Sequence, residues 1–155
     1  MEDHHQATHA MKDVKYLRAK LARVLIEYFG NDDRRINHAL NVLYHTDCLM
    51  GDHPGCDPEI AVASALLHDV GIKISEEKHG YNNGKTQEEY GPAIAAALLK
   101  GIGFPADKIE IVKNIIGNHH SPSRYAYPEL ALLKEADLIV NKAEDLHESQ
   151  EEVHG

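Results

Sequence analysis

The sequence lacks any long hydrophobic run. No stretch of the 155 residues approaches the roughly 20 consecutive apolar residues that a membrane-spanning helix requires. The first residues, MEDHHQATHAMKD, also lack the apolar core of a secretory signal. We therefore expect a cytoplasmic protein with no membrane partner.

Positive charge is also scarce. Lysine and arginine number 16 against 25 aspartate and glutamate residues, which gives a formal net charge of −9. A field of this sign repels nucleic acid polymers and anionic membranes unless it is locally inverted, and a bound cation could invert it. The composition favours a small-molecule partner over a nucleic acid polymer.

Cysteine is limited to Cys48 and Cys56. Together with His45 and His53 they form two His-x2-Cys pairs, a spacing that a structural zinc site could use. The glycines and the proline of residues 51–55 leave only a short connection to fold back into a tetrahedral site. A helix end followed by a turn is the simpler interpretation, and a disulfide is not expected in a cytoplasmic chain.

Period-two alternation, the pattern of a half-buried strand, never persists, whereas apolar residues follow helical spacing nearly everywhere. The pattern predicts an all-α fold, a compact bundle of about six helices in one domain. The core is expected over about residues 16–145, between polar termini. The expected helices cover roughly residues 12–29, 32–51, 58–69, 86–100, 105–118 and 128–146.

Local signals support several helix boundaries. Asp57 and Pro58 supply an N-cap and a first-turn proline. Thr86 and Glu89 form a capping box for the next helix, in which Pro92 is expected to introduce a kink or a restart.

The segment between these two helices, KISEEKHGYNNGKTQ from Lys73 to Gln87, is expected to be irregular. An irregular segment of this length needs an explanation, and a substrate lid or a plain mobile loop would supply one.

The stretch EIAVASALLHDV places a histidine and a carboxylate at the end of a helix that is apolar on nearly every face. Such a helix is buried, so His68 and Asp69 are buried with it. An ionised carboxylate in that position must be paired or must bind a metal, and the negative end of the helix dipole favours a cation. A histidine capped by its neighbour's carboxylate is the alternative.

Two further polar residues share apolar stripes. His38 lies in line with Val42, which predicts that its ring faces inward. Asp137 shares a face with Leu133 and Val140, where a solvated acid is not expected.

One divalent ion would explain all four residues. Mixed nitrogen and oxygen ligands suit manganese, iron, nickel, cobalt or zinc better than calcium, and the sequence does not choose among these five. The predicted ligands come from three separate helices and are His38, His68, Asp69 and Asp137.

The pattern H…HD…D resembles that of the HD-domain superfamily of metal-dependent phosphohydrolases. The resemblance extends from about residue 16 to residue 145 and includes, in order, RINHALNVL, AVASALLHDVGIK, GPAIAAALLKGIGF, IVKNIIGNHHSP and LALLKEADLIVN. It implies a helical bundle, hydrolysis of a phosphate ester that is often part of a nucleotide, and a metal held by the four residues that match the motif: His38, His68, Asp69 and Asp137.

The chain departs from the family at three places. Some members carry an acid three residues beyond the motif aspartate, where this chain has Ile72. Others bind a second metal through additional histidines, but Tyr90 stands where some relatives have a histidine, so one ion is favoured over two. Lys73 lies one residue later than the lysine of the related HDxGK signature.

A divalent ion lowers the pKa of its bound water from 15.7 towards about 7 and neutralises charge on phosphoryl oxygens. Asp69 is the ligand best placed to orient that water. His119 and His120 suit substrate stabilisation or protonation of the leaving oxygen, because histidine titrates near neutral pH. The predicted catalytic residues are therefore Asp69, His119 and His120, and the candidate phosphate contacts are Lys73, Lys85 and Arg124.

Three functions follow from this pattern. The first is a phosphohydrolase acting on a nucleotide or another small phosphorylated metabolite. The second is a module that binds a nucleotide without turnover, a hypothesis favoured by Ile72. In the third the metal only joins three helices, which predicts that the apo protein unfolds. The sequence leaves open whether the chain forms a homodimer.

Overall fold

The computed structural model describes the backbone of residues 2–154 and the side chains of residues 14–148. The expected polar termini lie largely outside the described side chains. Within the described backbone the chain forms helices only, so the all-α prediction is confirmed, with one helix more than expected. The elements are α1 (Glu2–Phe29), α2 (Asp33–Leu49), the 3-10 turn η1 (Met50–Asp52), α3 (Pro58–Leu67), α4 (Gly71–His79), α5 (Gly84–Gly101), α6 (Ala106–Ile116) and α7 (Pro128–His154).

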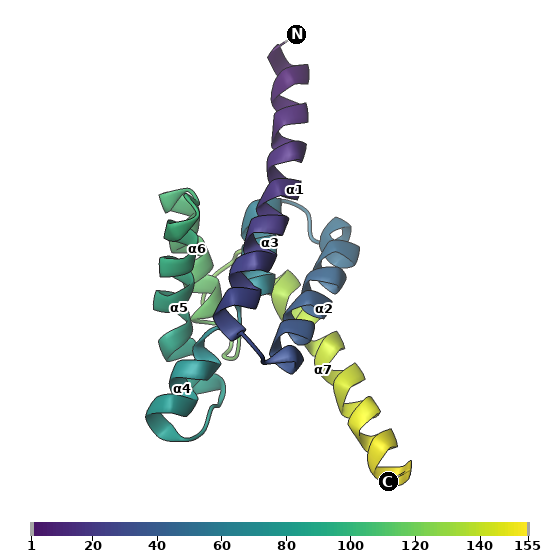
Figure 1. Cartoon of the computed structure of the whole chain (residues 1–155). Coiled ribbons are helices and arrows are strands. Elements are labelled where there is room, and N and C mark those ends of the chain that lie inside the picture. The colour runs from purple at the N-terminus through teal and green to yellow at the C-terminus, as the bar shows by residue number, and fades with distance from the viewer. Residues whose placement is uncertain (1, 155) are drawn as a thin grey trace.

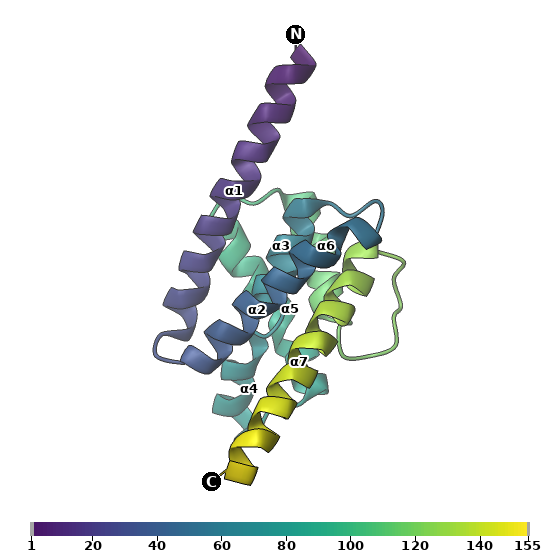
Figure 2. The same ribbon diagram turned by 90° about the vertical axis from the view of Figure 1, so that its right-hand side faces the viewer.

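Helix α3 lies at the centre of the bundle. Helices α1, α2, α6 and α7 all contact it (Figure 1). Every residue from 60 to 67 is buried, which explains why its sequence has no polar face. The first half of α1 and the last half of α7 project from opposite ends of the bundle (Figures 1 and 2).

The predicted cap of α3 is present. The Asp57 side chain accepts hydrogen bonds from the backbone N–H groups of Glu59 and Ile60, and Pro58 occupies the first turn. Asp32 caps α2 in the same way, by accepting a hydrogen bond from the backbone N–H of Arg35 at 3.2 Å. The second cap orients the helix that carries His38.

The prediction of an irregular segment over residues 73–87 is wrong, and with it the expectation of a long lid or loop. Helix α4 occupies residues 71–79, and only residues 80–83 connect it to α5. Helix α4 ends at His79 and is capped by Gly80, whose φ of 76° favours glycine. A nine-residue helix is marginal by itself, so packing on α5 sustains it.

Helix α5 also begins earlier than predicted. Its N-cap is Asn83, whose side chain accepts from the backbone N–H of Thr86 while the Thr86 hydroxyl accepts from the backbone N–H of Asn83. Thr86 is thus the distal member of the capping box and not its first residue. The helix continues through Pro92 without the expected restart.

Helices α4 and α5 approach closely where two glycines face each other. A Cβ atom on Gly71 would lie 2.7 Å from the backbone nitrogen of Gly91 and 2.9 Å from the carbonyl oxygen of Gln87. Only glycine permits this contact, which places α5 against the residues that follow His68 and Asp69.

The segment that contains the cysteines forms the expected helix end and turn. Helix α2 ends at Leu49, η1 follows, and both Cys48 and Cys56 are free thiols. No helix among the described residues is long and apolar enough to cross a bilayer.

Candidate metal centre

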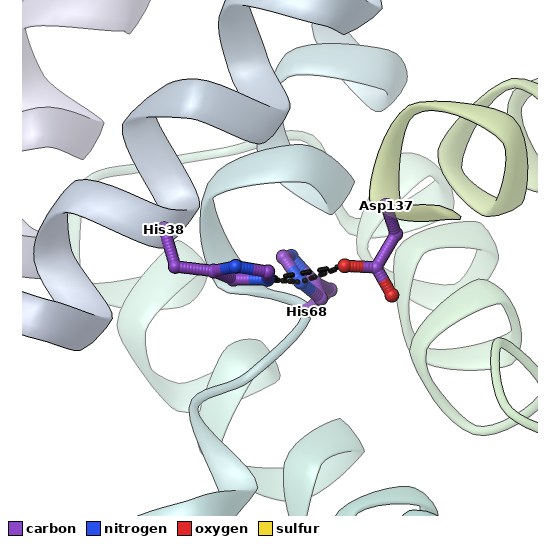
Figure 3. A group of neighbouring side chains, drawn as sticks. All are labelled: His38, His68 and Asp137. Carbon is purple, nitrogen blue, oxygen red and sulfur yellow. Dashed lines mark hydrogen bonds and ion pairs between the residues drawn. The ribbon is translucent and has the colours of Figure 1, made fainter. Parts of the chain in front are cut away.

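Three helices bring the predicted metal ligands together. His38 lies in the second turn of α2, His68 is the C-cap residue of α3 and Asp69 follows it, and Asp137 lies on α7. Figure 3 shows His38, His68 and Asp137 pointing toward one another from these helices. His68 is fully buried, and the other three are nearly so.

The atoms that face one another are nitrogens and carboxylate oxygens. Nε2 of His38 lies 3.3 Å from Nε2 of His68, 3.1 Å from Oδ1 of Asp137 and 3.3 Å from Oδ2 of Asp69. Nε2 of His68 lies 3.3 Å from Oδ2 of Asp69 and 3.4 Å from Oδ1 of Asp137. The Nε2 atoms of both histidines therefore lie close to the same two carboxylate oxygens, one from Asp69 and one from Asp137.

The outer ring nitrogens of both histidines already have partners. Nδ1–H of His68 donates to the carbonyl oxygen of Ala65 at 2.7 Å, and Nδ1–H of His38 donates to the Glu144 carboxylate at 2.9 Å. In the neutral ring each Nε2 therefore presents a lone pair to the shared centre. This outer hydrogen bonding is the arrangement that orients histidine ligands of metals.

The spacing of these atoms fits a small divalent ion. Ligand atoms about 2.1 Å from a common ion lie roughly 3.0 Å apart across a right angle and roughly 3.4 Å apart across a tetrahedral angle. The separations between the facing atoms, 3.1 to 3.4 Å, lie in that range. His38, His68 and Asp137 therefore form a group that could hold a metal ion, and Asp69 lies against both histidines of this group.

In the metal-free protein, the two carboxylates favour protonation of the neighbouring histidine. Burial alone disfavours a charged His68, but Asp69 and Asp137 outweigh burial and hold the pKa of His68 well above its ordinary value. Burial likewise disfavours an ionised Asp69, yet His68 and His38 lower the pKa of its carboxyl to about 2. The pKa of Asp137 is also lowered: its burial is outweighed by hydrogen bonds from His38 and His68. Both carboxylates therefore stay ionised and require a cation beside them.

A second group of potential ligands adjoins the first. One ligand atom from each of Asp69, His119 and His120 lies within 4.8 Å of the others. Nδ1–H of His119 donates to the carbonyl oxygen of Ile116 at 2.6 Å, and its Nε2 is buried without a hydrogen-bond partner among the described residues. Burial, together with His68 and His120, lowers the pKa of His119 to about 3. His119 is therefore neutral and presents an unpaired lone pair, so this group is one that could hold a metal ion.

Three of the four predicted ligands line an open pocket of about 310 Å³, and His68 lies buried behind them. His38, Asp69 and Asp137 line it, and His120 lies at its edge. The other residues that line the pocket are Arg34, Arg35, Ile72, Asn82, Gln87, Asn141 and Glu144. Apart from Ile72, none of these was predicted from the sequence to belong to the site.

The cations of this pocket are Arg34 and Arg35, within its described lining. They precede His38 by four and three residues, a spacing that places them on its side of α2. This spacing is a signal that could have identified them from the sequence. No comparable signal marks Asn82, Gln87 or Asn141, because their position depends on how α4, α5 and α7 pack.

The three cations predicted as phosphate contacts lie elsewhere. The Lys73 ammonium is 5.4 Å from the centre of the Tyr28 ring, toward α1. Lys85 is exposed in the first turn of α5, and the Arg124 guanidinium donates to the carbonyl oxygen of Gly117 at 3.3 Å. None of these three described side chains lines the pocket. Their role as phosphate contacts stays a prediction.

The family profile described as HD domain matches residues 35–144, a range that contains all four predicted ligands. The chain belongs to the HD domain family. The resemblance inferred from H…HD…D is thereby confirmed. A solved structure of a predicted HD superfamily hydrolase from an uncultured Thermotogales bacterium has the same fold as this HD domain, with a TM-score of 0.59 and 24% identity over 77% of this chain and 65% of that one.

Curated relatives share part of their length with this HD domain. Ribonuclease Y from Aquifex aeolicus is 31% identical over 121 residues, 74% of this chain and 19% of the relative. Ribonuclease Y from Clostridium kluyveri is 30% identical over 121 residues, 74% of this chain and 21% of the relative. The chain thus spans about one fifth of the length of these relatives.

Proposed function

We propose that this HD domain is a metal-dependent phosphohydrolase that cleaves a phosphate ester of a nucleotide or another small phosphorylated metabolite. One observation carries the proposal: the facing nitrogen and carboxylate oxygen atoms of the four predicted ligands lie beside a pocket that Arg34 and Arg35 line. The nitrogen and oxygen atoms suit a divalent metal ion, and the two arginines suit a phosphate.

The proposed ligands of the ion are His38, His68, Asp69 and Asp137, with manganese, iron, nickel, cobalt or zinc as candidates. Such an ion lowers the pKa of a coordinated water from 15.7 towards about 7 and offsets charge on phosphoryl oxygens. One ion is sufficient for this chemistry, and the group formed by Asp69, His119 and His120 is the proposed position of a second.

The chain's own residues divide the remaining tasks. Asp69, whose pKa is about 2, stays an acceptor at neutral pH and orients the attacking water by accepting its hydrogen bond. His119 is buried and neutral, so its Nε2 accepts a hydrogen bond or binds a cation. His120 lies at the exposed edge, where it can pass a proton to the leaving oxygen.

Arg34 and Arg35 are the proposed phosphate contacts. Arg35 is held by the carboxylates of Asp32 and Glu76, both 2.9 Å away, which fixes one guanidinium beside the pocket. Arg34 is paired with Glu148 at 3.2 Å, and its side chain is 85% exposed. It can therefore turn toward a phosphate with little loss of packing, and planar guanidinium groups match phosphate oxygens in pairs.

Two other functions have specific support. The relatives named Ribonuclease Y favour cleavage of a phosphodiester in RNA. Ile72, which lines the pocket where some family members carry an acid, favours binding of a nucleotide without turnover. The net charge of −9 disfavours a long polyanion as the partner.

The test is a substrate panel with the protein loaded in turn with each candidate metal. Nucleoside monophosphates, an aryl phosphodiester and a short RNA would be compared, with Asp69→Asn as the control. We expect metal-dependent release of phosphate from a monophosphate and none from the control. Cleavage of RNA alone would replace the proposal with the nuclease function. Nucleotide binding without turnover under every metal would replace it with the binding function, and unfolding on metal removal with neither activity would indicate a structural ion.

A further inference from the structure

A continuous chain of polar side chains runs along one edge of the pocket from α2 to His120. Arg35 contacts the Glu76 carboxylate at 2.9 and 3.2 Å, and Nδ2 of Asn82 donates to the same carboxylate at 3.1 Å. Nε2 of Gln87 donates to Oδ1 of Asn82 at 3.0 Å. Oε1 of Gln87 then contacts Nε2 of His120 at 2.5 Å. The chain joins residues from five segments and ends on a predicted catalytic residue.

The Glu76 carboxylate determines the direction of each following hydrogen bond in the chain. An ionised Glu76 can only accept, so Asn82 must donate its amide N–H to it and keep its oxygen for the next residue. Gln87 must then donate to that oxygen, which leaves its own oxygen to face His120. An oxygen can only accept, so Nε2 of His120 must carry the hydrogen.

His120 therefore differs from its neighbours in the site. His38, His68 and His119 all hold the hydrogen on Nδ1 and present Nε2. His120 holds the hydrogen on Nε2, so its available lone pair is on Nδ1. If the side-chain amide of Gln87 were reversed, its N–H group would face His120, and the hydrogen of the ring would move from Nε2 to Nδ1.

The ring of His120 is also fixed by packing on α5. The backbone N–H of His120 donates to Glu88 at 3.1 Å, and a Cβ atom on Gly84 would lie 2.9 Å from Cβ of His120. The hydroxyl of Ser121 donates to Glu88 at 2.6 Å. Backbone and ring are thus held against the same helix, and Gln87 is buried within the contact.

We infer that Gln87 is a positioning residue: the chain from Glu76 through Asn82 orients its amide so that His120, which adjoins Asp69 and His119, is held as the Nε2–H tautomer with its lone pair on Nδ1. The tautomer itself does not depend on the proposed function, whereas its use in binding an ion or in transferring a proton to the leaving oxygen rests on that function. Neither Gln87 nor Asn82 needs to touch the substrate for this effect.

The direct test is a long-range 1H–15N correlation spectrum of the metal-free protein at a pH where the rings are neutral. In the wild type we expect one His120 tautomer, with Nε2 protonated and its hydrogen protected from exchange. Gln87→Met should remove the protection and move both ring nitrogens toward a tautomer average. Asn82→Leu should do so partially, although Asn82 does not touch His120. Glu89→Met, an exposed change on the same helix, is the matched control.

A second measurement links the tautomer to the site. Loss of a hydrogen bond that orients a ligand typically weakens metal binding about 10- to 100-fold. We expect Gln87→Met to weaken Mn²⁺ binding by about 10-fold, the lower end of this range. Gln87→Glu should restore the affinity, because it keeps an acceptor for the Nε2–H group. Circular dichroism would verify that each variant is folded.

The outcomes separate the two claims. A wild-type His120 protonated on Nδ1, or a spectrum that Gln87→Met leaves unchanged, would overturn the inference whatever the protein hydrolyses. The expected spectra together with no turnover of any phosphate ester would leave the tautomer claim standing and remove the proposed function.

Discussion

The Nε2 atoms of His38 and His68 lie 3.3 Å apart, although neither ring, when neutral, can donate a hydrogen bond from that atom, because its hydrogen is on Nδ1. Two facing lone pairs, with the Asp69 and Asp137 carboxylates beside them, are stable only around a proton or a metal ion. This contact is the physical basis of the first two predictions.

Removing a proposed ligand should abolish tight metal binding. We expect Asp137→Ala to weaken binding of Mn²⁺ or Zn²⁺ by more than the roughly 10- to 100-fold that loss of an orienting residue costs. Glu144→Ala should fall within that range, because Glu144 only orients His38. Isothermal titration after chelation and dialysis measures both. Glu110→Ala, an exposed change on α6, is the control, and equal affinities in all variants would contradict the assignment.

The metal-free protein should lose stability as the pH rises above about 6.5. His68 has a raised pKa in the folded state, so its contribution is complete below its ordinary value of 6.5 and is lost as the pH passes its folded value. Asp69 has the opposite sign: its contribution is present above 3.8 and is lost as the pH falls toward about 2. Both contributions are complete between these two ordinary values.

His119, whose pKa is lowered to about 3, loses its contribution as the pH falls below its ordinary value of 6.5, so the His68 effect is clearest above that value. Thermal unfolding with a chelator should therefore give a higher Tm near about pH 6.5 than near about pH 8, by about 2–4 °C for each kcal/mol in a chain of this size. Saturating Mn²⁺ should reduce or reverse the difference, because the ion replaces the proton. His68→Gln should show a weaker pH dependence than the wild type. A chelated protein that becomes more stable between these two pH values would contradict the pairing of His68 with the carboxylates.

Arg34→Ala should raise KM for the phosphate ester with little change in stability. A hydrogen bond to a charged group contributes about 1.5–3 kcal/mol, which corresponds to roughly 10- to 100-fold in KM. The side chain is 85% exposed and has one ion pair with Glu148, so the fold should tolerate its loss. Steady-state kinetics with Lys100→Ala, an exposed cation at the far end of α5, as control would measure the effect. Equal KM values would exclude Arg34 as a phosphate contact.

Gly71→Ala should destabilise the fold by about 1–3 kcal/mol, because overpacking forces α4 away from α5. The added Cβ atom would meet backbone atoms of Gly91 and Gln87 at 2.7 and 2.9 Å, and neither can move independently of its helix. Gly101→Ala is the matched control: a Cβ atom there meets nothing within 4 Å, so it should be neutral or stabilising by up to about 1 kcal/mol. Chemical denaturation measures both, and equal midpoints would contradict the close approach.

The predicted helices were those with strong local signals. Asp57 and Pro58 mark the start of α3 in both sequence and structure, because a cap and a first-turn proline act within one turn. Helix α4 was missed because GIKISEEKH is short and polar, and its stability comes from contact with α5. Thr86 was assigned to the wrong end of a capping box because Asn83, three residues earlier, caps equally well.

Some residues of the candidate site could likewise be predicted from the sequence, and others could not. His38, His68, Asp69 and Asp137 could be predicted because polar groups in apolar stripes are conspicuous in a linear pattern. Arg34 and Arg35 were missed because charged residues on an exposed helix face are common and carry no such contrast. Gln87 and Asn82 could not have been selected, since their role depends on hydrogen bonds between α4, α5 and the segment that contains His120.

The sequence by itself determined that the chain is helical, that its central helix is buried, and that two histidines and two acids lie in otherwise apolar stripes. These follow from periodicity and from the cost of burying charge, which act along the chain. Only the tertiary structure decided which side of each imidazole faces the centre, which cations border the pocket and how α4 closes against α5. Those features depend on distances between segments far apart in sequence, which local preferences do not encode.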